Sequence, residues 1–343
     1  MSFSYQDRFH VVYAVTSVSN DYYSAMTRVS ITSLRHFNPQ CHVTIALDSE
    51  SLENLSSKKD PLLNEADSVL EVSTPEGCPQ FRNRFVKTSL TNHIAGPFLF
   101  MDSDTLVRSD VSEIFRPIAD IQGCLNHSHV NPTWQINKSD IHTLALMNWA
   151  TWKSQYINGG LIYYSGSEKS HNLGKLWHSN WLASFSKTGS PKDQPALNAA
   201  LASLNPSFNL LPIRFNAQIK INSLCALNAV IWHYYSSFDS PPITHVEALI
   251  NQASNGFSSF KDDVVRIAKM ETPWIRCDSF IGSYFLKSLN TKSHIDQCTL
   301  KYLEGSYFAS GVLLIPKIFY CILDKIKYRL NLMSNTIRRA TKY

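Results

Sequence analysis

The amino-acid sequence predicts an α/β domain with a mostly parallel central sheet that is flanked by helices. Short apolar runs rich in β-branched and aromatic residues alternate with longer segments of helical spacing over the first part of the chain. Strands that are separated by helices pair in parallel, and the connecting helices cover both faces of the sheet. With 44% hydrophobic and 17% charged residues, a chain of 343 residues can also bury a large core.

Each element follows from a local pattern. The first strand is the β-rich run from His10 to Val15, and the first helix shows Met26, Val29 and Leu34 at helical spacing before Pro39 stops it. The predicted strands cover residues 10–15, 42–47, 68–72, 98–101 and 159–164. The predicted helices cover residues 22–37, 51–59, 81–94 and 168–186.

The chain shows no internal repeat and no low-complexity linker, which favours one large domain with a carboxyl-terminal helical appendage. We expect the main domain at 8–250, an extension of the same domain at 251–307 and a tail at 308–343.

The strand at 98–101 runs directly into Asp102-Ser103-Asp104. Ligands of open α/β sheets bind at the carboxyl ends of strands, so chemistry is expected here. If the strand continued through the motif, the two carboxylates would share a face, and hard oxygen ligands suit Mg²⁺ or Mn²⁺ with a phosphate-bearing substrate. The alternative is a strand followed by an ordinary polar turn.

Composition excludes several classes of protein. Seven scattered cysteines, with no Cys-x-x-Cys pair, argue against a disulfide framework and a structural zinc site. Neither a Gly-x-Gly-x-x-Gly loop nor a Walker A sequence occurs, so dinucleotide and P-loop interpretations lose their main support. The amino terminus has no continuous apolar run, and we expect no signal peptide and a cytoplasmic protein.

The net charge of +5 is concentrated at the carboxyl end. Residues 317–343 hold seven Lys/Arg against Asp324, a local charge of +6, so the rest of the chain carries −1. The same segment has apolar residues at spacings of three and four, which predicts a basic amphipathic helix on an anionic membrane surface rather than a nucleic-acid-binding protein. The alternative is a terminal helix that packs on the core.

Four segments in this order resemble the motifs of GT-A fold glycosyltransferases, in particular glycosyltransferase family 8. They are Phe98-Leu-Phe-Met-Asp102-Ser-Asp104, Ile157-Asn158-Gly-Gly-Leu-Ile-Tyr163, Asp193-Gln194-Pro-Ala-Leu-Asn198, and Leu211-Pro-Ile-Arg-Phe-Asn216 followed by Ile231-Trp-His233. The resemblance covers about residues 8 to 236. It implies a GT-A-like fold and a retaining transfer of a hexose from a UDP-sugar to a glycan or lipid-linked acceptor such as lipopolysaccharide or capsule.

Carried over to this chain, the resemblance makes Asp102, Asp104 and His233 ligands of Mn²⁺ or Mg²⁺. Such an ion would offset the charge on the nucleotide diphosphate leaving group. The resemblance also implies that Asp193 and Gln194 lie near the anomeric carbon, as catalytic residues that position it and stabilise charge. Contacts with the donor are implied for Thr16, Asp21, Tyr22, Arg84, Lys87, Ser103 and Asn158.

Two positions depart from the family pattern. Pro195 replaces the second Asp of Asp-Gln-Asp, and the residues after His233 lack the Gly and Lys that usually bind the diphosphate. Arg84, Lys87 or Arg214 would then have to neutralise the phosphates. The alternatives are a phosphatase of the haloacid dehalogenase type that uses Asp102 and Asp104, and a GT-A-fold binding protein without activity.

Overall fold

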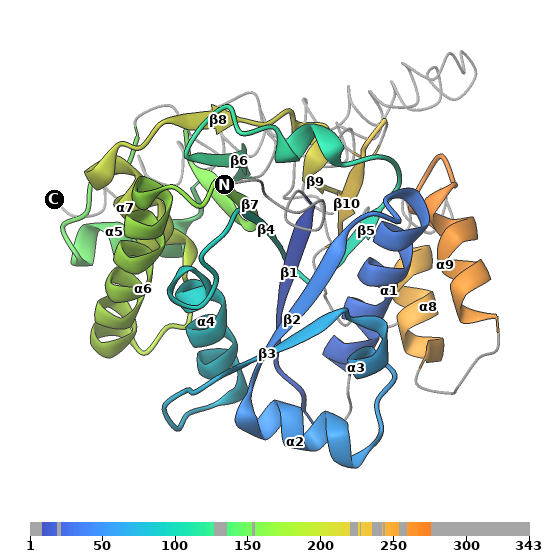
Figure 1. The fold of residues 1–343 in the computed structure, drawn as a ribbon. Helices are drawn as coiled ribbons and strands as arrows, with labels where there is room; N and C mark the ends of the chain where they lie inside the picture. The colour runs from blue at the N-terminus through green and yellow to red at the C-terminus, as the bar shows by residue number, and fades with distance from the viewer. Residues whose placement is uncertain are drawn as a thin grey trace, which may run out of the picture. The chain divides into compact units, whose positions relative to one another are not determined.

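A computed structural model describes residues 9–18, 22–126, 136–152, 155–219, 226, 228–234, 242, 244–253 and 259–275. Its central sheet has seven strands in the order β3-β2-β1-β4-β7-β6-β8 (Figure 1). They are β1 (His10–Val15), β2 (His42–Asp48), β3 (Ser68–Val72), β4 (Phe98–Met101), β6 (Ile121–Leu125), β7 (Ile157–Tyr164) and β8 (Phe208–Leu210).

The sheet is mostly parallel, as predicted. Strand β1 pairs in parallel with both β2 and β4, with Val11 opposite Val43 and Leu99. Strand β7 differs, since it runs antiparallel to both β4 and β6. All eight of its residues are buried, so the continuous apolar run that predicted the strand carries no information on its direction.

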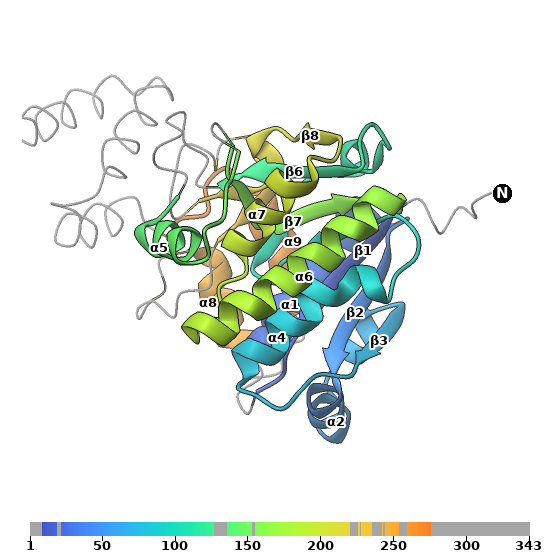
Figure 2. The same ribbon diagram turned by 90° about the vertical axis from the view of Figure 1, so that its left-hand side faces the viewer.

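Helices cover both faces of the sheet (Figures 1 and 2). Helices α4, α6 and α7 lie on one side, and α1 lies on the other. The main helices are α1 (Tyr22–Phe37), α2 (Ser49–Ser57), α3 (Leu62–Glu65), α4 (Pro79–Ser89), α5 (Lys138–Leu146), α6 (Glu168–Thr188), α7 (Gln194–Leu204), α8 (His245–Ala253) and α9 (Phe260–Ala268). The helix predicted at 81–94 is α4 followed by a 3-10 turn at Leu90–Asn92.

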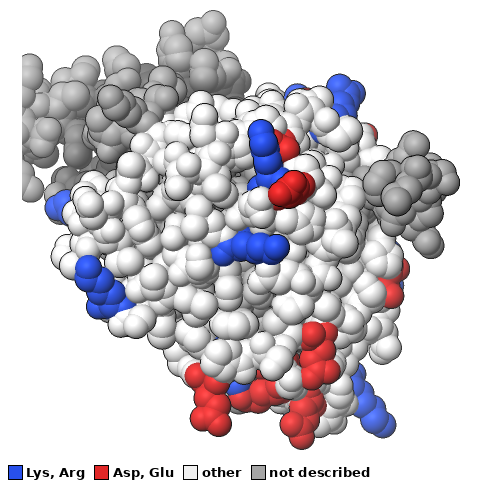
Figure 3. Space-filling model, turned by 60° about the vertical axis from the view of Figure 1, so that its left-hand side comes forward, with Lys and Arg blue, Asp and Glu red and all other residues white. Residues whose placement is uncertain are grey.

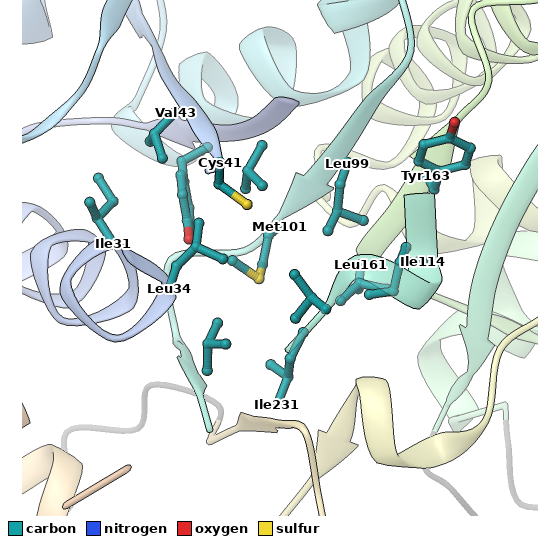
Figure 4. Close-up of a cluster of buried hydrophobic side chains, with 14 of the residues drawn as sticks. Ile31, Leu34, Cys41, Val43, Leu99, Met101, Ile114, Leu161, Tyr163 and Ile231 are labelled. Atoms are coloured by element: carbon teal, nitrogen blue, oxygen red, sulfur yellow. The ribbon is translucent and has the colours of Figure 1, made fainter. Parts of the chain in front are cut away.

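The hydrophobic core has one layer on each face because neighbouring residues of a strand point in opposite directions. On one face, Leu99 and Met101 of β4 pack with Ile31 and Leu34 of α1 (Figure 4). On the other face, Phe98 and Phe100 belong to a cluster with residues of α4, α6 and α7. Both layers meet at β4, and this packing fixes the strand that leads into Asp102.

Helix ends are defined by the sequence. Ser167 begins α6 by accepting a hydrogen bond from the amide of Ser170, and Gly189 ends it in the left-handed region at a φ of 68°. Asp48 caps α2 in the same way through the amide of Ser51. These caps predict element boundaries better than hydrophobic spacing does.

A second, three-stranded sheet lies beside the first, in the order β5-β10-β9. Its strands are β5 (Thr105–Val107), β9 (Ala217–Gln218) and β10 (Ile231–His233). Strand β10 runs antiparallel to β5, and His233 lies opposite Thr105. This register brings His233, which lies far along the chain, next to the segment that follows β4.

Helices α8 and α9 pack on α1 through a third hydrophobic cluster that includes Met26, Val246 and Val264. The chain divides after Trp274, and the described residues up to that point form one compact unit. None of the helices in the described ranges is long and apolar enough to cross a bilayer. The predicted tail at 308–343 lies outside the described residues.

Candidate active site

A cleft of about 650 Å³ opens where β1 and β4 end and where β7 begins. Because β7 runs antiparallel to β4, its amino-terminal residues lie at the same edge of the sheet as Asp102. Ten of the residues predicted for the site line this cleft. They are Thr16, Arg84, Lys87, Asp102, Ser103, Asp104, Asn158, Asp193, Gln194 and His233.

Residues 102–104 form a turn between β4 and β5, so the strand predicted to carry both carboxylates ends at Met101. The amide of Asp102 donates to the Gly160 carbonyl at 2.8 Å, and the amide of Tyr234 donates to the Asp104 carbonyl at 3.0 Å. The Thr105 hydroxyl donates to the Asp102 carbonyl at 2.8 Å. The condition under which a strand would place both carboxylates on one face is therefore not met, but the turn still brings their oxygens within 4.8 Å of each other.

His233 completes a group of three possible ligands. Its Nε2 lies 3.2 Å from Oδ1 of Asp104, and one ligand atom each of Asp102, Asp104 and His233 lies within 4.8 Å of the others. The histidine is 2% exposed. Burial lowers its pKa, but the Asp104 and Asp102 carboxylates together outweigh burial and raise the pKa above the ordinary value. The two carboxylates are hard oxygen ligands of the kind that Mg²⁺ and Mn²⁺ prefer, and the imidazole adds a nitrogen ligand.

Two basic residues of α4 reach the acidic groups of the cleft. The Lys87 ammonium lies 3.1 Å from Asp102 and 3.2 Å from Asp193, and its side chain is 3% exposed. Arg84 lies 3.3 Å from Asp193 and is more exposed. Their spacing of three residues puts both on one helix face, as expected from the sequence. Burial raises the pKa of Asp193, but Lys87 and Arg84 outweigh it and hold the pKa below its ordinary value.

Asp193 and Gln194 lie where α7 begins. Trp177 of α6 donates to the Asp193 carbonyl at 2.9 Å, and this bond fixes the start of the helix. The Gln194 side-chain oxygen accepts from the Gly159 amide at 3.2 Å and from the Asn158 side chain at 3.3 Å. Both residues are therefore held against β7.

Charges in the cleft are nearly balanced. The described basic residues that line it are Arg84, Lys87 and Lys192, and the acidic ones are Asp102, Asp104, Asp140 and Asp193. All three of these cations are already paired with carboxylates, since the Lys192 ammonium lies 3.8 Å from Asp140. The described lining therefore offers no excess positive charge for a diphosphate. Arg214 is not among the lining residues, because its guanidinium pairs with Glu113 on the surface.

Two predicted donor residues are not in the described lining. Tyr22 is 7% exposed and packs in the cluster of α1, α8 and α9, whereas its neighbour Tyr23 lines the cleft. The helix begins at Tyr22, so consecutive tyrosines point in different directions. Asp21 lies outside the described residues.

Several lining residues were not predicted. Asn83, Asn126, Asn137, Asp140 and Lys192 are among them. Asp140 is 2% exposed and accepts a hydrogen bond from the Tyr156 hydroxyl at 2.9 Å. The sequence pattern Asn137-Lys-Ser-Asp140 indicates only the start of a helix. The position of Asp140 in the cleft depends on the packing of α5 against α7.

Comparison with known proteins gives one family match and several similar solved structures. Residues 40–225 match the model of the nucleotide-diphospho-sugar transferase family. No curated protein sequence matches the chain. Among solved structures, the glycosyltransferase GlyE of Streptococcus pneumoniae TIGR4 aligns with a TM-score of 0.49 and 13% identity over 78% of this chain and 66% of GlyE. The galactosyltransferase LgtC, solved with donor and acceptor sugar analogues, aligns with a TM-score of 0.47 and 12% identity over 80% of this chain and 99% of LgtC.

A family model that covers residues 40–225 of a 343-residue chain matches more than half of it. The chain belongs to the nucleotide-diphospho-sugar transferase family, and this confirms the glycosyltransferase class and the GT-A fold predicted from the four motifs. The alternative of a haloacid dehalogenase phosphatase is wrong. Its nucleophile motif normally opens the domain, whereas Asp102 follows the fourth strand of the chain.

Proposed function

We propose that this protein transfers a hexose from a UDP-sugar to a glycan or lipid-linked acceptor of a surface polysaccharide, with a divalent cation and with retention of the anomeric configuration. The convergence of Asp102, Asp104 and His233 in the cleft of a nucleotide-diphospho-sugar transferase carries the proposal. The membrane role of the tail at 308–343 rests on its charge and spacing alone.

The three ligand candidates would hold Mn²⁺ or Mg²⁺, which would neutralise the negative charge that develops on the departing diphosphate. The charge balance of the cleft supports this requirement. A diphosphate that entered beside four carboxylates would meet net repulsion, because the lining offers only three basic residues among those described. Lys87 and Arg84 are the described cations nearest Asp102 and Asp193 and would share the phosphate contacts.

Two residues after β1 are suited to the nucleotide. The Thr16 hydroxyl is buried and has no hydrogen-bond partner within the described part of the chain, although the residue lines the cleft. A buried hydroxyl without a partner costs free energy, which a ligand contact would recover. Tyr23, rather than Tyr22, offers an aromatic face for stacking on the base.

Asp193 and Gln194 would act on the sugar. The Gln194 oxygen is already held by two N–H donors, and its amide nitrogen, which also bonds the Tyr156 hydroxyl, has a second hydrogen to donate to a substrate. We assign Gln194 a role as a hydrogen-bond donor that positions the sugar, not as a nucleophile. Asp193, kept ionised by Lys87 and Arg84, would stabilise positive charge at the anomeric carbon.

A panel of nucleotide sugars, assayed for hydrolysis with Mn²⁺ in the presence and absence of EDTA, tests the proposal. We expect at least one UDP-sugar to be hydrolysed with Mn²⁺ and none with EDTA. Hydrolysis that is unaffected by EDTA would contradict the role of the cation. Binding of UDP-sugars without hydrolysis, and without transfer to any acceptor, would instead identify a binding protein without activity.

A further inference from the structure

A chain of buried amide side chains connects β7 to His233. The Asn158 oxygen accepts from the Gly160 amide at 2.8 Å and from the Asn216 side-chain nitrogen at 3.0 Å. The Asn216 oxygen lies 2.8 Å from Nδ1 of His233. Asn158, Asn216 and His233 are 4%, 0% and 2% exposed, so these hydrogen bonds are shielded from water.

The direction of these hydrogen bonds is set by the backbone. A backbone N–H can only donate, so the amides of Gly159 and Gly160 identify the oxygens of Gln194 and Asn158 as acceptors. The Asn158 oxygen must then face the nitrogen of Asn216, because two oxygens would repel each other. This orientation leaves the Asn216 oxygen facing the imidazole ring.

The same logic fixes the imidazole. An amide oxygen only accepts, so Nδ1 of His233 must carry a hydrogen. Turning the Asn216 amide to suit the opposite tautomer would place its oxygen against the Asn158 oxygen, which the Gly160 amide holds in place. Nε2 is then the ring nitrogen that faces Asp104, at 3.2 Å from its carboxylate.

We infer that Asn216 is a positioning residue that holds His233 in the Nδ1–H form and so directs the Nε2 lone pair at the cation site. The inference rests on the proposed function, since Asn216 would act on the proposed cation only through His233. Asn216 does not line the cleft and would touch neither the donor nor the cation. Outer partners of this kind fix the tautomer and orientation of ligating histidines in metal sites.

The first test is made on the wild-type protein. In protein labelled with ¹⁵N-histidine, the His233 signals, assigned by their loss in His233→Ala, should show a hydrogen on Nδ1 both without a cation and with Mg²⁺ and UDP. A neutral ring with its hydrogen on Nε2 would overturn the inference.

The second test measures Mn²⁺ affinity by electron paramagnetic resonance in the presence of UDP. We expect Asn216→Leu to weaken Mn²⁺ binding about 10- to 100-fold, the range found for outer partners of metal ligands. Asn216→Asp keeps an acceptor for Nδ1, although its second oxygen meets the Asn158 oxygen in place of the amide nitrogen. It should therefore retain the Nδ1–H signal and lose some affinity, but less than Asn216→Leu. Asn38→Leu is the matched control, because Asn38 is also 0% exposed and bonds backbone groups far from the cleft.

The control should lose stability but bind Mn²⁺ as the wild type does. Wild-type affinity in both Asn216 variants would overturn the inference. If the wild type itself binds no Mn²⁺, the proposed function fails and the ¹⁵N signals alone decide the role of Asn216. If Asn216→Leu does not fold, the same decision rests on Asn216→Asp and on the wild-type spectrum.

Discussion

At the scale of single residues, the Lys87 ammonium lies between two carboxylates that come from different parts of the chain. Asp102 follows β4 and Asp193 begins α7, and both lie within 3.2 Å of it. The ring of Phe100 lies 4.9 Å away and adds a cation–π contact. Lys87 therefore joins the proposed cation site to the proposed sugar site.

Replacing Lys87 by Met keeps most of the side-chain volume and removes the charge. Breaking a buried ion pair leaves its partner uncompensated, and we expect a loss of about 3 kcal/mol in the free energy of unfolding at pH 7. Urea denaturation measures the loss. Lys187→Met is the control, because the Lys187 ammonium is exposed and its removal should cost less than about 0.5 kcal/mol.

The difference in stability between the wild type and Lys87→Met should also depend on pH. The pKa of Asp193 is lowered by folding, so its contribution to stability is present above the unfolded pKa of about 4 and is lost as the pH falls through the lower folded pKa. In Lys87→Met this contribution is reduced. The difference in stability between wild type and variant should therefore narrow below about pH 4. If the difference in the free energy of unfolding stayed constant from pH 7 to pH 3, the ion pair between Lys87 and Asp193 would not be its source.

How much of the site could be predicted differs from residue to residue. Asp102, Asp193 and His233 lie in linear motifs, so the sequence alone locates them. Asp140 and Lys192 lie in no such motif, and they reach the cleft through the packing of α5, α6 and α7. Tyr22 and Tyr23 are adjacent in sequence, and only the first turn of α1 decides which of them faces the cleft.

At the scale of elements, β7 supplies the floor of the site through two consecutive glycines. A Cβ atom on Gly160 would lie 2.6 Å from Cε1 of His233 and 2.7 Å from Oδ2 of Asp102. A Cβ atom on Gly159 would meet its nearest neighbours at 3.7 Å, an ordinary contact. The lack of a side chain at Gly160 is thus what lets the proposed ligands approach one another.

This contrast gives a matched pair of variants. We expect Gly160→Ala to abolish Mn²⁺-dependent binding of UDP, because Asp102 or His233 must move to admit the methyl group. Gly159→Ala should cause a smaller loss. Calorimetric titration with UDP and Mn²⁺ compares the two. Equal losses in both variants would indicate a general disturbance of β7 instead of a specific conflict with the ligands.

The strands also show which features of the sheet the hydrophobic periodicity of the sequence does not predict. Alternation of apolar runs and helical segments correctly predicted that β1, β2, β3 and β4 run parallel to one another. The direction of β7 depends on a long connection between β6 and β7 that contains α5, and no local pattern encodes it. The i, i+2 spacing of the aspartates was explained by a strand, whereas a turn produces the same convergence.

At the scale of the whole molecule, charge is unevenly distributed along the chain. The +6 of residues 317–343 exceeds the net charge of the complete sequence, so the remainder is slightly acidic. In the view of Figure 3, acidic side chains gather at the end where α2 lies, and uncharged surface separates the basic ones. A basic surface suited to anions is therefore expected from the tail rather than from this face.

Removal of residues 308–343 tests the tail separately from the active site. We expect hydrolysis of UDP-sugars to persist, because every described residue that lines the cleft precedes residue 234. Sedimentation with anionic vesicles should decrease, and salt should weaken the binding of the full chain, since screening acts beyond about 8 Å at physiological ionic strength. Equal sedimentation of both proteins would refute membrane attachment, and an insoluble truncation would support packing on the core.

Calorimetric titration of UDP into the wild-type protein with Mn²⁺ tests the central claim most directly. We predict binding that disappears with EDTA and in Asp102→Asn and Asp104→Asn, with a lesser loss in His233→Ala, because these side chains would hold the ion. Asp110→Asn, at an exposed carboxylate that does not line the cleft, is the control and should bind as the wild type does. UDP binding that is unchanged by EDTA and by both aspartate substitutions would contradict the assigned cation site.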